Sequence, residues 1–300
     1  MMWNACCQFF IFITVVQIPL AITGKMAYVD IGWPCGLVAL GCNGLWWGRG
    51  WSVRRFISCG CMILHGARMF IGALVMFYPY TFKDGDLSRY QFAKHRWVVE
   101  EKLYTALWPL KAQFDTLTQC FANCIILACP ILLAASNTTQ TFHILEIVGV
   151  LLWILSWVLE NIADGQKILF LKDCKSLAKQ QSTPERKEKI KLSVLGYHPF
   201  DTGKYCLWTW CRHPNYFFEW MSWVSFAMIG FGSIVTMNGW MGGDDVAPLT
   251  VLCSATLVLT MRFFYDCLVY WTGAAPAEQQ SVRKRPMYQK YQETTQVLFP

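Results

Sequence analysis

Residues 205–225 read YCLWTWCRHPNYFFEWMSWVS, and they join a polar, strongly basic segment to a long apolar one. Pro214 suits the first position of a helix, because it has no N–H to leave unsatisfied and its φ is already helical. A helix that begins there directs free N–H groups and a partial positive charge towards Arg212 and His213, which is a common way to bind phosphate. Basic and aromatic residues also mark helix ends at a lipid interface, so interfacial anchoring is the alternative interpretation.

The apolar stretch that follows carries a polar face. Asn215, Glu219 and Ser222 recur at helical spacing, so they share one side of the expected helix. Polar side chains inside a membrane span are costly and commonly mark a functional site. Interfacial anchoring does not explain them, and we therefore expect a site near the first turns of this helix.

The composition is that of a membrane protein. Of the 300 residues, 55% are hydrophobic and only 15% are charged, whereas about a quarter of the residues in a soluble domain are charged. Apolar stretches close to the roughly 20 residues that cross a bilayer recur along the chain. The sequence predicts an all-α, multi-pass integral membrane protein with about seven spans, at residues 5–24, 31–47, 56–79, 117–135, 142–162, 215–236 and 247–271.

Basic residues are distributed unevenly between the two sides of these spans. If the C-terminal tail is cytosolic, the cytosolic segments hold 21 of the 26 Lys and Arg residues, as basic loops usually do. This one-sided charge favours anionic headgroups or a phosphorylated cofactor on the cytosolic side, and nucleic acid is not an expected partner. On the outer side, Asn137 begins a glycosylation sequon in a short loop.

Familiar soluble-enzyme and metal motifs are missing from the sequence. Of the 14 cysteines, 11 fall in apolar stretches, where cysteine behaves as a small apolar residue. No C-x-x-C pair or Cys/His cluster has metal-ligand spacing, so we expect no metal site and no disulfide framework. There is also no P-loop, no G-x-G-x-x-G after a strand and no G-x-S-x-G.

A second polar face lies where the fifth span ends. Glu160, Asp164 and Lys167 follow one another at spacings of four and three, which places them on one helix face at the membrane edge. One interpretation is a helix-end salt bridge, worth a few tenths of a kcal/mol. The other is a site in which Lys167 receives a phosphate or Glu160 a sugar hydroxyl. The spacing alone leaves both interpretations open.

Three strings together resemble the steroid 5-alpha-reductase-like membrane proteins. They are ENIADGQKILF at 160–170, LWTWCRHPNYFFEW at 207–220 and TGAAPAEQQSVRKRPMYQKYQETTQVLFP at 272–300. The resemblance covers most of the chain and is closest to an uncharacterised branch, a domain of unknown function, which Asp30, Trp33, Arg89 and Tyr90 also fit. Sterol C14 and C7 reductases share parts of these strings, and isoprenylcysteine carboxyl methyltransferases are related.

The resemblance implies one integral membrane domain that binds NADPH in a cytosolic pocket formed by its C-terminal half. Residues 1–135 would form helices on the substrate side, and residues 142–300 would form the cofactor region. Position by position, it assigns cofactor binding to nine residues: Lys167, Trp208, Arg212, His213, Asn215, Tyr216, Glu278, Arg285 and Tyr291.

The expected reaction is reduction of an activated C=C bond in a lipophilic substrate, such as a steroid, a sterol or a fatty-enoyl compound, with hydride from NADPH. The protein would position the nicotinamide and supply a proton. Tyr216 and Glu219 are the expected catalytic residues, with Tyr28 and Tyr90 as alternative proton donors. The expected partners are this substrate and membrane lipid, and in a eukaryote the expected membrane is the endoplasmic reticulum.

Two other functions stay open. One is an S-adenosylmethionine-dependent isoprenylcysteine or phospholipid methyltransferase, a class whose C-terminal half also has an RHP-x-Y string and a Y-x-x-Y tail. The other is a non-catalytic lipid-binding membrane protein. The chain departs from the reductase pattern at Cys206 and Phe218, where the family usually has glycine, and Phe218 would narrow the cofactor groove.

Overall fold

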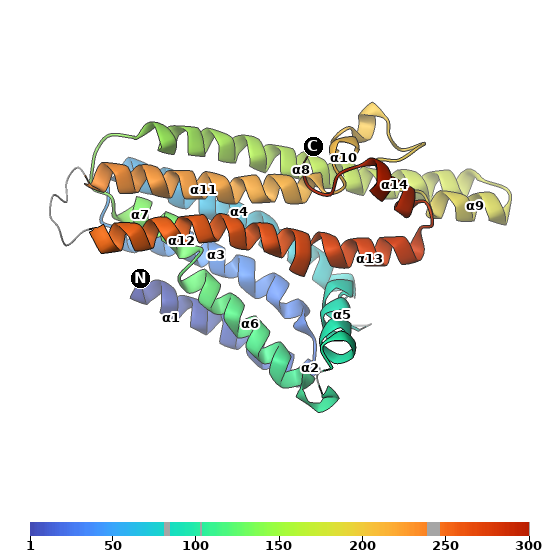
Figure 1. Ribbon diagram of the computed structural model, residues 1–300, viewed down its shortest axis with the longest axis horizontal. Helices are drawn as coiled ribbons and strands as arrows, with labels where there is room; N and C mark the ends of the chain where they lie inside the picture. Colours follow the sequence, from blue (N-terminus) through green and yellow to red (C-terminus); the bar gives the residue numbers. More distant parts are fainter. Residues whose placement is uncertain (81–84, 103, 239–246, 300) are drawn as a thin grey trace. The chain divides into compact units, whose positions relative to one another are not determined.

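The computed structural model describes residues 1–80, 85–102, 104–238 and 247–299. Every regular element in these residues is a helix, which confirms the predicted all-α class (Figure 1). The α-helices are α1 (Met2–Ile11), α2 (Ile18–Thr23), α3 (Val29–Trp47), α4 (Ser52–Tyr80), α5 (Ser88–His95), α6 (Trp108–Cys124), α7 (Ala128–Ser136), α8 (Ile144–Gln180), α9 (Pro184–Lys191), α10 (Leu207–Trp210), α11 (Pro214–Asn238), α12 (Ala247–Asp266), α13 (Ala274–Lys284) and α14 (Tyr288–Thr294). Short 3₁₀ or π-helical turns are η1 (Phe12–Gln17), η2 (Met26–Tyr28), η3 (Arg96–Glu100), η4 (Thr105–Leu107), η5 (Gly203–Tyr205) and η7 (Cys267–Trp271).

Among the described residues, six helical segments are long and apolar enough to cross a bilayer. They are Met2–Thr23, Ser52–Val75, Thr105–Ser136, Ile144–Gln180, Pro214–Met237 and Pro248–Lys284. They correspond to six of the seven predicted spans and confirm the multi-pass class. The remaining predicted span, 31–47, coincides with the 19-residue helix α3, in which glycine, tryptophan, Asp30 and Asn43 lower the hydropathy. A seventh span therefore stays a prediction.

The helix α8 is long enough to cross the membrane and continue beyond it. Its 37 residues extend over about 55 Å at 1.5 Å per residue, whereas the hydrocarbon core is about 30 Å thick. The first half of α8 is apolar, and the second half carries Lys167, Lys172, Lys175 and Lys179. The second half of this helix therefore presents polar side chains beyond a single span.

The chain forms two compact units. Unit 1 comprises residues 1–153 and 223–263, and unit 2 comprises residues 154–222 and 264–300. Three helices, α8, α11 and α12, contribute residues to both units. The predicted division into substrate-side and cofactor regions follows other boundaries and stays a prediction.

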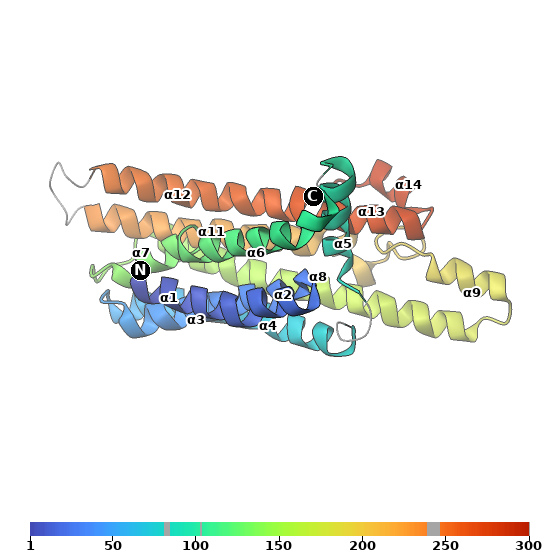
Figure 2. The ribbon, with the colours of Figure 1, turned by 90° about the horizontal axis from the view of Figure 1, so that it is seen from below.

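In unit 1, glycines allow close packing of apolar helices. A Cβ atom at Gly230 of α11 would lie 2.8 Å from Leu257 of α12, and these two helices run side by side (Figure 2). A Cβ atom at Gly41 of α3 would lie 2.6 Å from Ile63 of α4. Small residues at such contacts let helix backbones approach closely, which is how helices associate inside a membrane.

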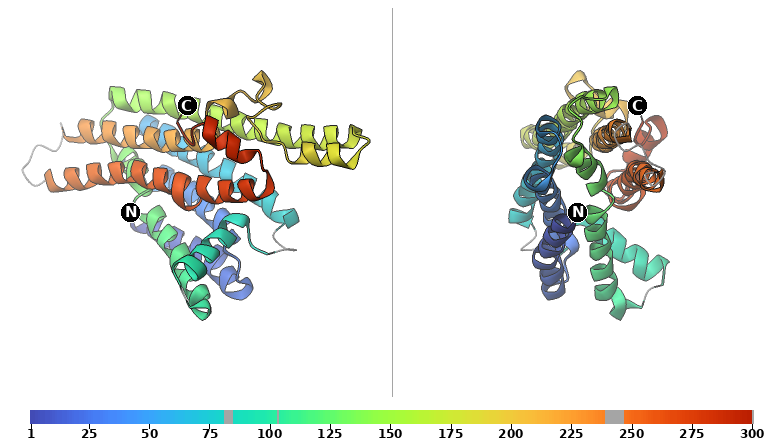
Figure 3. Two further views of the ribbon diagram at one scale, coloured as in Figure 1. Left: turned by 45° about the vertical axis from the view of Figure 1, so that its right-hand side comes forward. Right: turned by 90° about the vertical axis from the view of Figure 1, so that its left-hand side faces the viewer.

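Buried amide side chains join α1, α3 and α6 of unit 1, of which α1 and α6 can be followed in Figure 3. Gln8 donates to the carbonyl oxygen of Gly36 at 2.8 Å and to Oδ1 of Asn4 at 3.1 Å. Asn123 donates to Oε1 of Gln8 at 3.1 Å. These amides are almost completely buried, and hydrogen bonds of this kind hold helices together in an apolar surrounding. The sequence did not single them out.

Unit 1 also contains a buried ion pair. Nε of Arg54 lies 2.6 Å from Oε1 of Glu146, and both side chains are about 1% exposed. Glu146 also accepts a hydrogen bond from Ser233 at 2.8 Å. Asn137 has no exposed surface and donates to the carbonyl oxygen of Ser233 and to Oγ1 of Thr236. The predicted sequon is therefore inaccessible in the folded protein.

Candidate functional site

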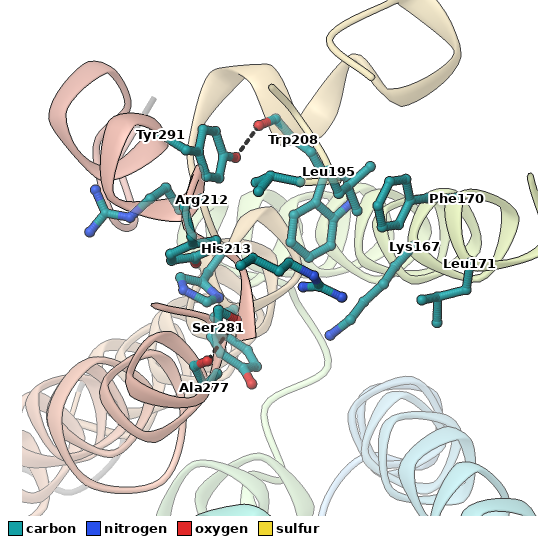
Figure 4. Close-up of a pocket in the computed structure, with 14 residues that line it drawn as sticks. Lys167, Phe170, Leu171, Leu195, Trp208, Arg212, His213, Ala277, Ser281 and Tyr291 are labelled. Carbon is teal, nitrogen blue, oxygen red and sulfur yellow. Dashed lines mark hydrogen bonds between the residues drawn. The ribbon is translucent and has the colours of Figure 1, made fainter. Parts of the chain in front are cut away.

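Unit 2 contains a cavity of about 90 Å³ to which α8, the loop after α9, the start of α11 and the α13–α14 segment contribute (Figure 4). Its wall combines cations, aromatic rings and aliphatic side chains. The lining residues are Lys167, Phe170, Leu171, Val194, Leu195, Trp208, Arg212, His213, Tyr216, Ala277, Ser281, Arg285, Tyr288 and Tyr291. Pockets that enclose a whole drug-sized ligand measure roughly 300–1,000 Å³, so this cavity suits one group of a larger ligand, such as a phosphate.

Seven of the nine residues predicted to bind a cofactor line this cavity. They are Lys167, Trp208, Arg212, His213, Tyr216, Arg285 and Tyr291. The other two do not line it: Glu278 contacts Arg212 and His213 of the wall, and Asn215 contacts Asp164. The structure thus brings together segments that are far apart in the sequence, while cofactor binding itself stays a prediction.

Two cations of the wall, Lys167 and Arg285, have no charged partner among the described residues. Their side chains form no hydrogen bond or ion pair with any residue that the structure describes. The amine of Lys167 lies 5.7 Å from the centre of the Trp208 ring, a weak cation–π contact, and Figure 4 shows these two side chains next to each other. Lys167 therefore does not form the helix-end salt bridge that was one interpretation of its spacing. Its charge is available to an anion.

Arg212 is used differently from what the sequence suggested. Its Nε and Nη2 atoms donate to the two oxygens of Glu278, at 2.7 and 3.1 Å. Its Nη1 atom donates to the carbonyl oxygens of Gln292 and Thr295. A two-point arginine–carboxylate contact is among the stronger hydrogen-bonded pairs. The N–H groups that we expected to bind a phosphate thus form hydrogen bonds within the protein. Through them Arg212 holds the C-terminal tail in place.

Glu278 connects several residues of this region. Besides Arg212, its carboxylate contacts Nε2 of His213 at 2.9 Å and accepts a hydrogen bond from Gln292 at 2.6 Å. The His213 ring stacks on Tyr216, with ring centres 5.1 Å apart and planes 9° from parallel. Burial lowers the pKa of His213 below its usual 6.5, although the Glu278 carboxylate opposes this shift. Burial therefore favours the neutral form of the His213 ring.

The C-terminal tail is held against the segment that precedes α11. The backbone N–H groups of Arg212 and His213 donate to the carbonyl oxygens of Gln296 and Val297, at 2.8 and 3.2 Å. The hydroxyl of Tyr291 donates to the carbonyl oxygen of Trp208, as the dashed line in Figure 4 shows. Burial raises the pKa of Tyr291, so this hydroxyl keeps its proton. The tail is part of the pocket wall.

The sequence missed the contribution of the loop after α9. Val194 and Leu195 lie in a stretch that reads as polar and solvated, yet both are buried and line the cavity. Gly196 follows them at φ +82°, where a Cβ atom would collide with the backbone of Trp208. A Val-Leu-Gly triplet inside a charged segment is the local signal that could have predicted this turn.

The other predicted residues do not line the cavity. Asn215 donates to Asp164 at 3.2 Å, and Glu219 is buried without lining the cavity. Phe218 packs in a cluster with Ala163 and Leu207. The expected narrowing of the groove by Phe218 is therefore absent from the described cavity.

The remaining departure, Cys206, and the alternative proton donors are also not among the residues that line the cavity. The side-chain amide of Gln166 lies 3.6 Å from the sulfur of Cys206. Tyr28 and Tyr90 belong to unit 1. There the Tyr90 hydroxyl donates to Asp30, whose other oxygen lies 2.6 Å from Nη2 of Arg89. The Tyr90 hydroxyl is thus already engaged as a hydrogen-bond donor to a carboxylate.

Comparisons with known proteins give a family but no activity. The family model described as "Protein of unknown function (DUF1295)" matches residues 18–295. A curated relative, the uncharacterised protein C594.04c of Schizosaccharomyces pombe, is 25% identical over 283 residues, which cover 93% of this chain and 73% of that protein. No solved structure matches the chain significantly.

Proposed function

The chain belongs to the DUF1295 family of proteins of unknown function, and from the pocket of unit 2 we propose that it is a membrane-embedded, NADPH-dependent reductase. The proposed substrate is a lipophilic molecule with an activated C=C bond, such as a steroid, a sterol or a fatty-enoyl compound. The proposal includes the finer resemblance of the three sequence strings to steroid 5-alpha-reductase-like proteins. A place in the endoplasmic reticulum membrane, in a eukaryote, belongs to the same proposal.

The observation that carries this proposal is the pair of uncompensated cations in an aromatic-walled cavity. Lys167 and Arg285 line it without a side-chain ion pair to any described residue. Lys167 is exposed and Arg285 is half-buried, so both charges are accessible to an anion, which would be attracted to two cations in one cavity. Trp208, Tyr216 and Tyr288 add flat apolar faces. A ligand that joins phosphate groups to planar rings complements this wall, and NADPH is such a ligand.

Different side chains of the pocket would bind different groups of NADPH. Lys167 and Arg285 would neutralise phosphate charge, and Arg suits this through its planar fork of donors. The aromatic rings would hold a base or ribose by stacking, and the 90 Å³ cavity would enclose only part of the dinucleotide. NADPH, when bound, supplies a hydride.

Among the predicted catalytic residues, the position of Tyr216 is best suited to supply a proton. Tyr216 lines the cavity, stacks on His213, and forms no hydrogen bond with a described residue through its hydroxyl. A phenol of this kind can donate a proton to a reacting carbon or oxygen. Glu219, by contrast, does not line the cavity.

Removal of each cation separately tests the pocket. We expect Lys167→Gln and Arg285→Gln each to weaken NADPH binding to the detergent-purified protein about tenfold or more, which is the effect of losing one charge-assisted hydrogen bond. Lys175→Gln, at an exposed position of the same helix α8, is the matched control and should leave the Kd unchanged. If the parent and the three variants bind NADPH with equal affinity, this pocket is not the NADPH site.

A further inference from the structure

His213 is positioned by a carboxylate that can only accept hydrogen bonds. Glu278 forms a two-point ion pair with Arg212, whose guanidinium is always charged, so the carboxyl group of Glu278 is ionised. An ionised carboxylate has no proton to donate. The 2.9 Å contact between Nε2 of His213 and Oε1 of Glu278 therefore requires the hydrogen to be on Nε2.

The second ring nitrogen of His213 is then fixed by elimination. A neutral imidazole carries one proton, so a proton on Nε2 leaves a lone pair on Nδ1. Nδ1 forms no hydrogen bond with any residue that the structure describes, and the side chain lines the cavity. The parallel ring of Tyr216 restricts rotation of the imidazole.

The neighbouring charges favour the neutral ring as well. Besides Glu278, the charged or titratable groups that face His213 are Lys167 of α8, Arg212 next to it in the chain, and Tyr216 of α11; Arg285 lines the same cavity. Two of these, Lys167 and Arg212, are cations that disfavour a third positive charge.

We infer that Glu278 holds His213 as the neutral Nε2–H tautomer, so that Nδ1 presents a hydrogen-bond acceptor to the cavity for an N–H or O–H group of the ligand. Glu278 is thus a positioning residue, and His213 is a residue that determines ligand specificity. This inference deepens the proposed function and rests on it for the identity of the ligand. With a nucleotide, the donor is an amino, amide or ribose hydroxyl group, and phosphate is recognised elsewhere in the pocket.

The tautomer can be measured without any ligand. In protein labelled with ¹⁵N-histidine, the signals that disappear in His213→Gln belong to His213. We expect a protonated Nε2 and an unprotonated Nδ1 at pH 7, and we expect Glu278→Gln to reduce this preference. A protonated Nδ1 at pH 7 in the parent protein overturns the inference, whatever the cofactor proves to be.

Two substitutions then separate the nitrogens in NADPH binding. In His213→Gln the side-chain amide can still donate to Glu278, but no acceptor replaces Nδ1. In His213→Asn the side-chain oxygen takes the place of Nδ1, while the donor to Glu278 is lost. We expect His213→Gln to raise the Kd about fivefold, the effect of one neutral hydrogen bond, and His213→Asn to bind more tightly than His213→Gln.

The outcomes distinguish failure of the inference about His213 from failure of the proposed function. If His213→Asn binds NADPH no better than His213→Gln, Nδ1 does not accept a hydrogen bond from the ligand and the inference fails while the proposed function stands. If the parent protein does not bind NADPH at all, the proposed function fails, and the ¹⁵N spectrum still decides whether Glu278 sets the tautomer. The adenosine half of the cofactor, 2′,5′-ADP, shows which part of the ligand carries the donor group. If His213→Gln binds 2′,5′-ADP fivefold more weakly than the parent protein does, the donor is on the adenine or its ribose.

Discussion

Arg212 and Glu278 stand 66 positions apart in the sequence and meet at two points, with Nε–Oε1 at 2.7 Å and Nη2–Oε2 at 3.1 Å. Through this pair the segment before α11 is fastened to α13, and through Nη1 of Arg212 it is fastened to the tail. Tyr288 and Tyr291, which line the cavity, lie on α14, the helix to which Nη1 of Arg212 is hydrogen-bonded. The ion pair therefore positions residues of the pocket wall without lining the cavity through Glu278.

Replacement of Arg212 should first affect stability. A lysine keeps the charge but loses the planar fork that contacts Glu278 and two carbonyl oxygens. We expect Arg212→Lys to lower the free energy of unfolding by about 1.5–3 kcal/mol, the range for hydrogen bonds to charged groups, seen as a lower Tm in detergent. Arg283→Lys, at an exposed position of α13, is the control. If Arg212→Lys has the parent's Tm but binds NADPH more weakly, the guanidinium group of Arg212 contacts the ligand, which contradicts this account.

Stability should also fall below neutral pH because of His213. Burial lowers the pKa of this ring in the folded protein below 6.5, so the unfolded chain takes up a proton at a higher pH than the folded one does. The contribution of His213 to stability is therefore complete above pH 6.5 and decreases as the pH falls through 6.5 towards the folded-state pKa. We expect the Tm to drop between pH 7 and pH 5.5, and the drop to be smaller in His213→Gln. Equal pH profiles of the two proteins would contradict this.

Gly36 should be intolerant of a methyl group. A Cβ atom there would collide with the side-chain amides of Gln8 and Asn123, which hold α1, α3 and α6 together. Because overpacking of a filled core costs about 1–3 kcal/mol, we expect Gly36→Ala to lower the Tm. Apart from the backbone of its own helix and its chain neighbours, nothing lies within 4 Å of the Cβ position of Gly60 in α4, so Gly60→Ala should leave the Tm unchanged or raise it. Similar effects of both substitutions would argue against the buried amide contacts.

The sequon at Asn137 should carry no glycan. The side chain has no exposed surface, and its amide nitrogen donates to Ser233 and Thr236, so an enzyme cannot reach it after folding. When the protein is expressed in a glycosylating eukaryotic cell, we expect the same electrophoretic mobility before and after treatment with a glycosidase. A mobility shift that Asn137→Gln abolishes would be the opposite result.

The sequence predicted the class of the fold and the approximate positions of its main helices. α11 begins at Pro214, as expected from the missing N–H and fixed φ of proline, and the apolar stretches became helices because their length and composition leave a membrane span few alternatives. The convergence of Lys167, Trp208 and Arg285 in one cavity was foreseen only through the resemblance, since spacing along the chain does not say which distant helix ends meet.

What remained hidden depends on tertiary contacts. The partners of Arg212 come from the tail, and no local pattern distinguishes an arginine that meets Glu278 from one that meets a phosphate. Val194 and Leu195 are two apolar residues in a charged segment, too short a run to predict burial. The amides Gln8 and Asn123 lie 115 residues apart, so only the folded chain brings them together.

The most direct test of the proposed function is which nucleotide stabilises the purified protein against heat. Because Lys167 and Arg285 present positive charge, we expect NADPH to raise the Tm and S-adenosylmethionine, which carries a positive sulfonium group, to leave it unchanged. At a hundredfold excess over Kd the stabilisation should be about 2.7 kcal/mol. It should decrease with NADH, which lacks one phosphate, and disappear when both cations are replaced. A rise in Tm with S-adenosylmethionine and none with NADPH would contradict the reductase account and favour a methyltransferase.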